Sequence, residues 1–394
     1  MSRTRLWVGL DVGAEEMAVC GTDSDGTVIF EHLIPTNAAA LHAVLKSEKR
    51  RIKLIGLEAG SFAIPLTNSL RRLGYPVAVF DTRQASKFLA IRQNKTDKND
   101  ARGLADLTRL GRGSVSEVHV KSSECQRLRS TLVTRQKLLQ MRMAAEGAIR
   151  SLFRLNGGRL RPCSSAAKLR KYVIDELKLI RKVAKVDLSE EVGQLLALSE
   201  AIRTYLEGLD RKLSEMASEH DVCRRFLEIP GVGPLCALSF YSSVDDPTRF
   251  RRNADVGAYL GMVPMVRQSG LSTSRLRISK MGDAMTRTYL TTAAQHHLRF
   301  ANSALTAWGA LLAEHLGKKG VSVAVGRKIA ITMLAMWKSG ERYDPYRSAS
   351  AADVPAKESL EAVGLQGAAG WETAANPEDS ILRGVMAQPA GELA

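Results

Sequence analysis

The sequence predicts an α/β amino-terminal domain followed by a mostly helical remainder. Three short β-prone runs at residues 6–12, 17–22 and 27–32 precede an alternation of helical and strand-like segments that extends to about residue 112. Between about residues 122 and 220, Pro and Gly become rare and apolar residues recur at helical spacing. The chain has 394 residues, which at about 150 residues per domain allows two to three domains.

The order of the expected elements identifies the kind of sheet. Gly13-Ala14 and Asp23-Ser24-Asp25-Gly26 separate the first three strands, so these strands form an antiparallel meander. The patterns then predict a helix at 38–49, a strand at 52–58, a helix at 62–73, a strand at 76–80 and helices after residue 83. This is the order of a ribonuclease-H-like sheet, because a doubly wound nucleotide-binding fold alternates from its first strand.

A heptad pattern runs through the helical middle of the chain. Nine positions from 188 to 216 step by four and three residues, and one of them is polar: Leu188, Val192, Leu195, Ser199, Ile202, Leu206, Leu209, Leu213 and Met216. This spacing predicts a coiled coil. The pattern fits either a contact between copies of the chain, in a dimer or tetramer, or a helical hairpin within one chain.

The charge of the chain favours a polyanionic partner. Lys and Arg exceed Asp and Glu by 16, and the pI is near 9.8. Residues 121–185 carry 17 cations against four acids, and residues 247–299 carry nine against two. Cations placed on phosphates release condensed counterions, so nucleic acid is the expected partner. Solvated basic faces are the alternative.

Other classes of protein are excluded. The five cysteines are scattered and form no Cys-x-x-Cys pair, which argues against a disulfide framework or a zinc cluster and for a reducing compartment. The first residues lack the apolar stretch of a signal peptide, and no segment has about 18 consecutive apolar residues. We therefore expect a cytoplasmic protein without a membrane segment.

Four regions are expected along the chain: a carboxylate domain at 1–115, a basic helical and coiled-coil region at 116–221, a mostly α-helical domain at 222–346 and a disordered acidic tail at 347–394. The third region opens on Pro230-Gly231-Val232-Gly233 between apolar helical segments. This resembles a helix-hairpin-helix motif, in which the backbone N–H groups of Gly231 and Gly233 would approach a DNA phosphate. A plain helix connector is the alternative.

Two acidic residues end strands that are otherwise apolar. Asp11 lies in Trp7-Val-Gly-Leu-Asp-Val-Gly13, and Glu58 ends Ile52-Lys-Leu-Ile-Gly-Leu-Glu58. An unpaired buried carboxylate is costly, so each needs a cation or a place at the open end of the sheet. Since the two strands are expected to be neighbours, the pair suits a hard divalent cation.

Two further acids begin a predicted helix. Thr96 fits an N-cap, and Asp97 and Asp100 occupy the first turn, on the stripe that Leu104 and Leu107 continue. They are therefore expected to face the sheet, whereas Asp106 lies off the stripe. The alternative is that both simply complement the helix dipole, which is worth about 0.3–1 kcal/mol.

Together the four carboxylates predict metal-assisted phosphoryl transfer. Such chemistry uses two Mg²⁺ ions about 3.5–4 Å apart, one at the attacking oxygen and one at the leaving oxygen. No GxxxxGK[ST] or GxGxxG sequence follows any expected strand, which disfavours a nucleotide-hydrolysing motor.

A loop at residues 259–283 is rich in Ser, Gly and Arg and has no histidine nearby. Its composition favours phosphate binding over a serine nucleophile with a local histidine base. Four cations could hold a DNA backbone or neutralise charge on a scissile phosphate, although a solvated role for some of them is the alternative: Arg267, Arg275, Arg277 and Lys280.

At this point the chain resembles a known family, the DEDD transposases of bacterial insertion sequences, which are recombinases guided by a bridge RNA. The resemblance covers about residues 5–340. It rests on six motifs in order: Gly9-Leu-Asp-Val-Gly13, Leu57-Glu-Ala-Gly60, Lys95-Thr-Asp-Lys-Asn-Asp-Ala101, Pro230-Gly-Val-Gly-Pro234, Tyr259-Leu-Gly-Met-Val-Pro264, and Ser269-Gly270 followed by Ile278-Ser-Lys-Met-Gly-Asp283.

The resemblance implies a RuvC-like domain with Asp11, Glu58, Asp97 and Asp100 as its acids, a coiled-coil insertion, and a nucleophilic serine that matches Ser269. It implies an RNA-guided transposase that cleaves and rejoins donor and target double-stranded DNA through a phosphoserine link, with Mg²⁺ as cofactor. Two alternatives stay open. One is a hydrolytic junction resolvase in which Ser269 only binds phosphate, and the other is a non-enzymatic nucleic-acid-binding protein.

Overall fold

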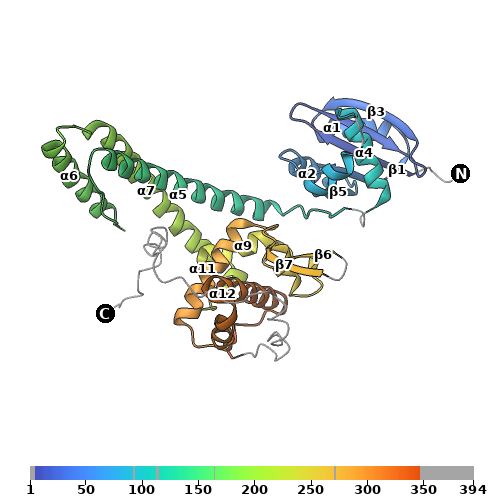
Figure 1. Ribbon diagram of the computed structural model, residues 1–394. Helices are drawn as coiled ribbons and strands as arrows, with labels where there is room; N and C mark the ends of the chain where they lie inside the picture. The colour runs from blue at the N-terminus through green and yellow to red at the C-terminus, as the bar shows by residue number, and fades with distance from the viewer. Residues whose placement is uncertain (1–4, 92–93, 112–114, 164, 270–271, 347–394) are drawn as a thin grey trace. The chain divides into compact units, whose positions relative to one another are not determined.

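The computed structural model describes residues 5–91, 94–111, 115–163, 165–269 and 272–346. It divides into two compact units, Met1–Lys121 and Ser122–Ala394 (Figure 1). We describe each unit by itself. The acidic tail predicted at 347–394 lies outside the described residues.

The first unit is built on a mixed five-stranded sheet of order β3-β2-β1-β4-β5. The strands are β1 (Arg5–Val12), β2 (Glu16–Thr22), β3 (Val28–Pro35), β4 (Arg51–Glu58) and β5 (Val77–Phe80). β1 pairs antiparallel with β2 and parallel with β4, and β2 and β3 complete the meander. This is the ribonuclease-H-like order expected from the sequence, with strand limits within three residues of the predicted ones.

Helices cover both faces of this sheet. α1 (Ala38–Ser47) and α2 (Ala63–Arg72) bury their leucines against the side chains of β1 and β4 that include Leu10 and Leu57. The opposite face packs against α3 (Thr82–Leu89) and α4 (Asp97–Leu110), through a cluster that includes Phe80 and Leu104. The sheet therefore forms the middle layer of an α/β/α unit.

The first unit extends slightly beyond the boundary predicted at residue 115. The Asp81 amide donates to the Ser116 carbonyl at 3.0 Å, and the Val118 amide donates to the Val79 carbonyl at 2.7 Å. Val120 is buried in the core beneath α1 and α2. Because these contacts continue the edge of the sheet, the unit ends at Lys121.

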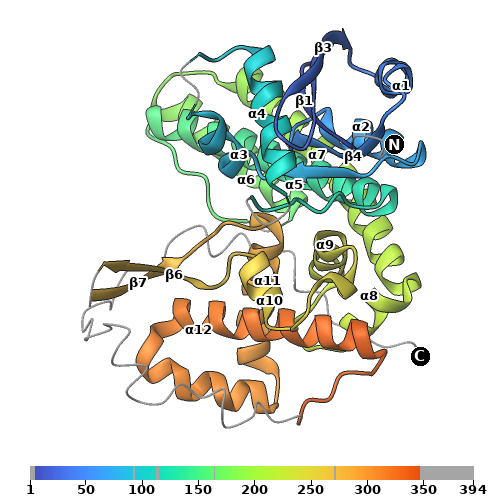
Figure 2. The ribbon, with the colours of Figure 1, turned by 90° about the vertical axis from the view of Figure 1, so that its right-hand side faces the viewer.

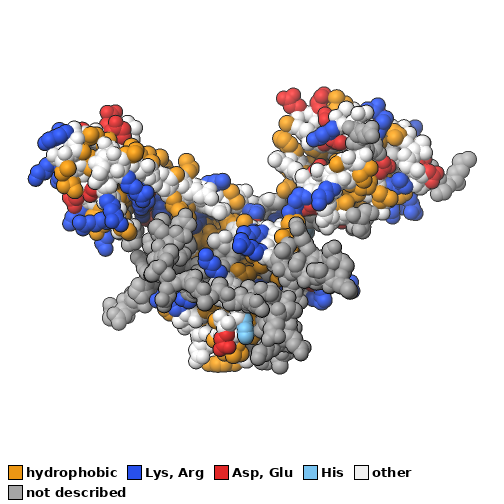
Figure 3. Space-filling model, viewed as in Figure 1, with side chains coloured by type: hydrophobic (Ala, Val, Ile, Leu, Met, Phe, Trp, Pro, Cys, Tyr) orange, Lys and Arg blue, Asp and Glu red, His pale blue; other side chains and the backbone are white. Residues whose placement is uncertain are grey.

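The second unit begins with a long helical hairpin. α5 (Ser123–Leu155) runs out, α6 (Ala166–Val183) lies near the turn, and α7 (Ser189–Glu219) returns beside α5 (Figure 1). Lys and Arg side chains gather towards the end that carries α6 (Figure 3). Of the heptad seam, Val192, Ser199, Ile202, Leu206 and Leu213 are buried within this hairpin. The seam thus packs within one chain, which is the hairpin alternative.

The rest of the second unit is mostly helical. It comprises α8 (Asp221–Phe226), α9 (Pro234–Val244), η1 (Pro247–Arg249), α10 (Asp255–Tyr259), α11 (Ala284–Phe300) and α12 (Ala304–Ser339), with one hairpin of β6 (Pro264–Ser269) and β7 (Ser272–Ile278). Figure 2 shows this hairpin projecting beyond the helices. A core of apolar side chains from α8, α9, α11 and α12 holds the unit together.

One helix among the described residues is long and apolar enough to cross a membrane by length and composition alone. This helix, α12, has half of its most apolar window buried inside the protein. Its backbone leaves helical geometry at Gly317, where φ is 63°. Val325, Ile329 and Met333 are fully or almost fully buried in the core, so α12 has the surroundings of a core helix.

Candidate active site

Asp11 and Glu58 end neighbouring parallel strands. In the register of β1 and β4, Leu10 pairs with Leu57, so the two acids are the next residues along. Alternation along a strand gives Asp11 the same face as Gly9, and Glu58 the same face as Gly56. Both acids are half-buried. The sheet therefore presents two carboxylates together at one edge, on the face that α4 covers.

Two glycines let α4 approach this face closely. A Cβ at Gly9 would lie 2.1 Å from the Ala105 amide nitrogen and 2.2 Å from the Ala101 carbonyl oxygen. A Cβ at Gly56 would lie 1.9 Å from the Thr108 hydroxyl oxygen. No larger residue fits at either position, because real Cβ contacts are never that short. The helix thus rests on the backbone of β1 and β4, through contacts that begin about one turn after its first residue, Asp97.

The first turn of α4 carries the other two acids. The Thr96 hydroxyl accepts a hydrogen bond from the Asn99 amide at 3.2 Å, which is the N-cap expected from the sequence. Leu104 and Leu107 are buried as predicted, whereas Asp100 is half-buried and Asp97 is exposed. The side chains on the sheet-facing side of α4 therefore become more exposed towards the start of the helix, where the sheet ends.

The four carboxylates interact electrostatically. Burial raises the pKa of Asp11, and the charges of Asp100 and Asp97 raise it further. Burial also raises the pKa of Glu58, with further contributions from the charges of Asp11 and Asp100. Like charges are thus gathered at this edge of the sheet, and ionising Asp11 and Glu58 costs free energy there.

Lys95 interacts with the acids, which its sequence position alone did not lead us to expect. Its charge lowers the pKa of both Asp11 and Glu58, although by less than burial and the neighbouring acids raise it. Lys95 is exposed and directly precedes the N-cap Thr96. The sequence feature that could have predicted this interaction is the motif Lys95-Thr-Asp97, in which a cation lies two residues before an acid of the cluster.

Two cations of α4, Lys98 and Arg102, form ion pairs with an acid outside the cluster. Arg102 and Lys98 both bind Glu31 on β3, with Arg102 Nη2 2.8 Å and Lys98 Nζ 2.9 Å from a carboxylate oxygen. The Arg102 guanidinium holds the pKa of Glu31 below its usual range. Over the described part of the chain, none of the four acids forms an ion pair. Asp106, one turn further along α4, lies 3.9 Å from Arg109 and stays outside the cluster.

The donor chemistry of this cluster fits a hard divalent cation, since four carboxylates supply oxygens without a neutralising ion pair. Among the residues described, no three Asp, Glu, His or Cys side chains form a group that could hold a metal ion by themselves. Mg²⁺ does not require such a cage, because it keeps several waters and typically takes one or two carboxylates together with substrate phosphate oxygens. Asp11 and Glu58 are the pair that fits this mode.

Ser269 is the last residue of β6, at the tip of its hairpin. In the register it lies opposite Ser272 on β7, and Arg267 lies opposite Ser274. Arg275 lies opposite Val266. The side chains of residues 266–276 lie outside the described part of the structure, so Ser269, Arg267 and Arg275 are located by backbone alone.

The base of this hairpin is tightly held. The Lys280 amide donates to the Gly261 carbonyl at 3.0 Å, and the Arg287 guanidinium donates to the carbonyls of Leu260 and Gly282 at 2.9 and 2.8 Å. Lys280 itself adopts a φ of 54°. Its side chain and that of Arg277 are exposed. The hairpin that carries Ser269 therefore rises from a fixed base bordered by two exposed cations.

The two glycines of the predicted helix-hairpin-helix differ. Gly231 has a φ of 90°, and a Cβ there would lie 2.4 Å from the Ala293 carbonyl oxygen of α11. Its need for glycine is thus explained by packing within the protein. Gly233 caps α9, and no heavy atom lies within 4 Å of its Cβ position. Only Gly233 has open space in front of it.

Comparison with known proteins gives matches over most of the chain. Residues 8–155 match a family of DEDD transposases, and residues 223–308 match the transposase IS116/IS110/IS902 family. A transposase for insertion sequence element IS1111A from Coxiella burnetii is 29% identical over 347 residues, 85% of this chain and 90% of that protein. A probable family 20 transposase from Pseudomonas aeruginosa is 24% identical, over 86% of this chain and 98% of that protein.

The ribonuclease-H-like sheet and these matches define a DNA transposase, and therefore an enzyme. The first matched segment covers the first unit and continues through α5, and the second matched segment lies within the second unit. The chain belongs to the IS110/IS116 family of insertion-sequence transposases.

Proposed function

We propose that this transposase cleaves and rejoins DNA through a serine-linked intermediate, with Ser269 as nucleophile and the four carboxylates as its divalent-metal site. The observation that carries the proposal is the electrostatic coupling of Asp11, Glu58, Asp97 and Asp100 without a neutralising ion pair in the described residues. Such a cluster is costly unless a cation joins it when the enzyme acts.

In the proposed step, Ser269 Oγ attacks the phosphorus of a DNA phosphodiester. The Oγ–P bond forms, the bond from phosphorus to one sugar oxygen breaks, and the serine proton is balanced by the proton that the leaving oxygen takes up. Because one phosphodiester replaces another, a hydroxyl end of a second strand can reverse the step without ATP. Mg²⁺ would polarise the phosphate and stabilise the charge on the attacking and leaving oxygens. Two ions are expected from the sequence.

Different side chains would bind the metal ion and the DNA backbone. Asp11 and Glu58 would hold the cation at the edge of the sheet, and the exposed Arg277 and Lys280 would hold the DNA backbone beside the hairpin. Arg267 and Arg275, at their register positions in β6 and β7, are the further candidates for phosphate contact. For the reaction to occur, Ser269 and the acids must reach the same phosphate.

A covalent-adduct assay tests this proposal. We expect wild-type protein with Mg²⁺ to form a denaturation-resistant protein–DNA adduct, and Ser269→Ala to form none. Ser272→Ala, the register partner of Ser269, is the matched control and should retain the adduct. Asp11→Ala should lose metal-dependent cleavage but still bind DNA. Cleavage by Ser269→Ala without any adduct would instead identify a hydrolytic nuclease of the junction-resolvase type.

The proposed partners are donor and target double-stranded DNA, a guide RNA and further copies of the chain, acting in the bacterial cytoplasm. The net charge of +16 supports a nucleic-acid partner of either kind. Since the heptad seam packs within one chain, a dimer or tetramer would use another surface. Treating the purified complex with ribonuclease tests the RNA: loss of copurified nucleic acid and of site-specific cleavage is expected.

A further inference from the structure

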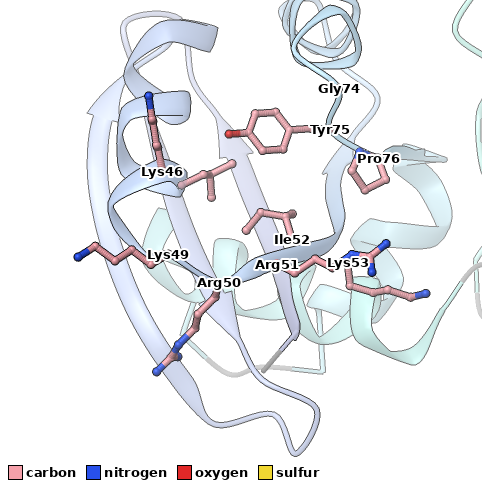
Figure 4. A pocket seen from close by; sticks show the side chains of 10 residues that line it. Lys46, Lys49, Arg50, Arg51, Ile52, Lys53, Gly74, Tyr75 and Pro76 are labelled. Atoms are coloured by element: carbon pink, nitrogen blue, oxygen red, sulfur yellow. The ribbon is translucent and has the colours of Figure 1, made fainter. Parts of the chain in front are cut away.

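A basic hollow lies at the end of the sheet opposite the acids. It has a volume of about 760 Å³ and lies between the end of α1, the start of β4 and the turn before β5. Five cations line it: Lys46, Lys49, Arg50, Arg51 and Lys53. In Figure 4 these side chains stand on two sides, with Ile52 and Tyr75 between them. All five are exposed.

The pairing of the strands adds a further cation to this end. Arg51 on β4 is the register partner of Arg5 on β1, so two arginines stand side by side on neighbouring strands. Like charges in such positions destabilise a sheet. The register also shifts here, because Leu6 pairs with Ile52 while Trp7 pairs with Leu54, which leaves Lys53 without a partner on β1. A bulge of this kind re-aims a side chain and often lies beside a functional site.

The turn into β4 has an unfavourable backbone conformation. Lys49 has a φ of 51°, in the left-handed region that glycine or asparagine normally occupies after a helix. For a residue with a Cβ this conformation is unfavourable, because the Cβ comes too close to the following carbonyl oxygen. The turn thereby places Lys49 and Arg50 next to the cations of β4.

Among the described residues, no acid balances the charge of these cations. The lining contains no acid. Within the described chain, none of the five lining cations forms an ion pair, and the half-buried Glu48 between them in sequence pairs with none. Together with Arg5, six cations at one edge of the sheet therefore lack an anion within the part of the chain that the structure describes, which favours an external one.

The aromatic wall of the hollow is fixed in place. The Tyr75 hydroxyl and His42 Nδ1 form a hydrogen bond of 2.8 Å, and the two rings meet edge to face with centroids 5.7 Å apart. Cations interleaved with an aromatic ring are typical of sites for single-stranded nucleic acid, where phosphates bind the cations and an unstacked base packs on the ring. A regular duplex offers no free base face.

We propose that this hollow binds a single-stranded or looped segment of nucleic acid, outside the segment that is cleaved. The inference rests on the proposed function of the chain as a nucleic-acid recombinase. β4 runs from Arg51 at the hollow to Glu58 at the acids, seven steps of about 3.3 Å, so the two sites lie roughly 23 Å apart along the strand. The hollow therefore contacts a different stretch of nucleic acid from the acids.

A binding assay with the full chain in the presence of EDTA tests this proposal. The probes are single-stranded RNA, single-stranded DNA and duplex DNA of equal length, titrated at several salt concentrations. For Arg50→Gln with Lys53→Gln we expect weaker binding of a single-stranded probe by about tenfold. The salt slope should fall by about 1.4, since each lost single-strand phosphate contact contributes about 0.7.

The matched control is Arg72→Gln with Lys87→Gln, which removes two exposed cations outside the lining of the hollow. This control should bind as wild type. A loss confined to RNA or to single-stranded DNA identifies the source of the strand and supports the site. Unchanged affinity and salt slope, or a loss confined to duplex DNA, would overturn the proposal. Because the assay contains no metal and measures no cleavage, it is independent of the adduct test for Ser269.

Discussion

Gly9 of β1 and Ala105 of α4 touch backbone to backbone, so closely that a Cβ at Gly9 would lie 2.1 Å from the Ala105 amide nitrogen. Asp11 is two residues beyond Gly9 on the same face of the strand, and Asp100 is just over one turn before Ala105 on the helix. This single contact therefore brings together carboxylates that are separated by almost ninety positions in the sequence.

Replacing Gly9 should disturb both stability and the acid cluster. In Gly9→Ala the new methyl group must displace α4, and we expect a loss of about 1–3 kcal/mol in the free energy of unfolding, as for other overpacked cores. DNA cleavage should fall as well, because Asp97 and Asp100 move with the helix. Urea denaturation and a cleavage assay measure the two effects.

The control for this substitution is Gly60→Ala, since no heavy atom lies within 4 Å of a Cβ at Gly60. We expect its stability to change by less than about 0.5 kcal/mol, as for an ordinary surface substitution. Equal stability of Gly9→Ala and Gly60→Ala would show that α4 does not rest on β1.

The raised pKa values of Asp11 and Glu58 predict a specific pH dependence. A carboxyl group whose pKa is raised in the folded state stabilises the fold below its unfolded pKa, and this stability is lost as the pH rises through the folded pKa. Without metal, the contribution of the two groups should therefore decline from about pH 4 upward, starting near their ordinary values of 3.8 and 4.5. Thermal unfolding between pH 4 and 8 measures it.

Asp11→Asn isolates that effect. At neutral pH this substitution removes one negative charge from the cluster, so without Mg²⁺ the variant should be more stable than wild type. Its DNA cleavage should be slower by roughly 10³-fold or more, equivalent to several kcal/mol of metal-assisted stabilisation of the transition state. Mg²⁺ should raise the melting temperature of wild type and not that of Asp11→Asn. An equal Mg²⁺ effect in both would contradict the site, whereas Asp106→Asn, outside the cluster, should keep the wild-type response.

The two glycines of the Pro230–Gly233 turn allow packing to be separated from DNA contact. Gly231→Ala would place a methyl group 2.4 Å from the Ala293 carbonyl in a left-handed conformation, and should cost about 2–4 kcal/mol of stability. Gly233→Ala meets no atom and should leave the melting temperature unchanged. If the backbone at Gly233 approaches a phosphate, Gly233→Ala weakens duplex DNA binding. Unchanged binding would identify the turn as a helix connector.

The sheet was predictable because each of its strands has its own local pattern. The expected strand at 52–58 is observed as β4 (Arg51–Glu58), and Thr96 caps α4 as its sequence predicts. The positions of the four acids, in apolar strands and in the first turn of a helix, were predictable, and their catalytic role stays a prediction. The coupling of Asp11 to Asp100 depends on how closely α4 approaches the sheet, and the role of Gly9 in that approach is visible only once the two elements are packed together.

The heptad seam shows the limit of periodicity. The heptad spacing alone fits both a hairpin and a contact between chains, since a helix of the same chain or of another copy can pack against the same apolar positions. The polar position Ser199 is what distinguishes them here: it donates to Glu146 of α5, 53 residues away in the same chain, at 3.1 Å. Neither residue indicates the other in the sequence, because Glu146 is simply one of the two acids of a basic helix.

Glu146 is the buried countercharge of three arginines, and its removal should destabilise the hairpin. Its side chain lies 2.6 Å from Arg203, 3.7 Å from Arg142 and 3.6 Å from Arg150, and the residue is 7% exposed. Glu146→Gln would remove the ion-pair partner that the three guanidinium groups share, and breaking a buried pair in this way costs about 3–5 kcal/mol. Glu207→Gln, on the exposed face of α7, should cost less than about 0.5 kcal/mol. Urea denaturation followed by circular dichroism measures both, and equal midpoints would show that water already compensates the three arginines.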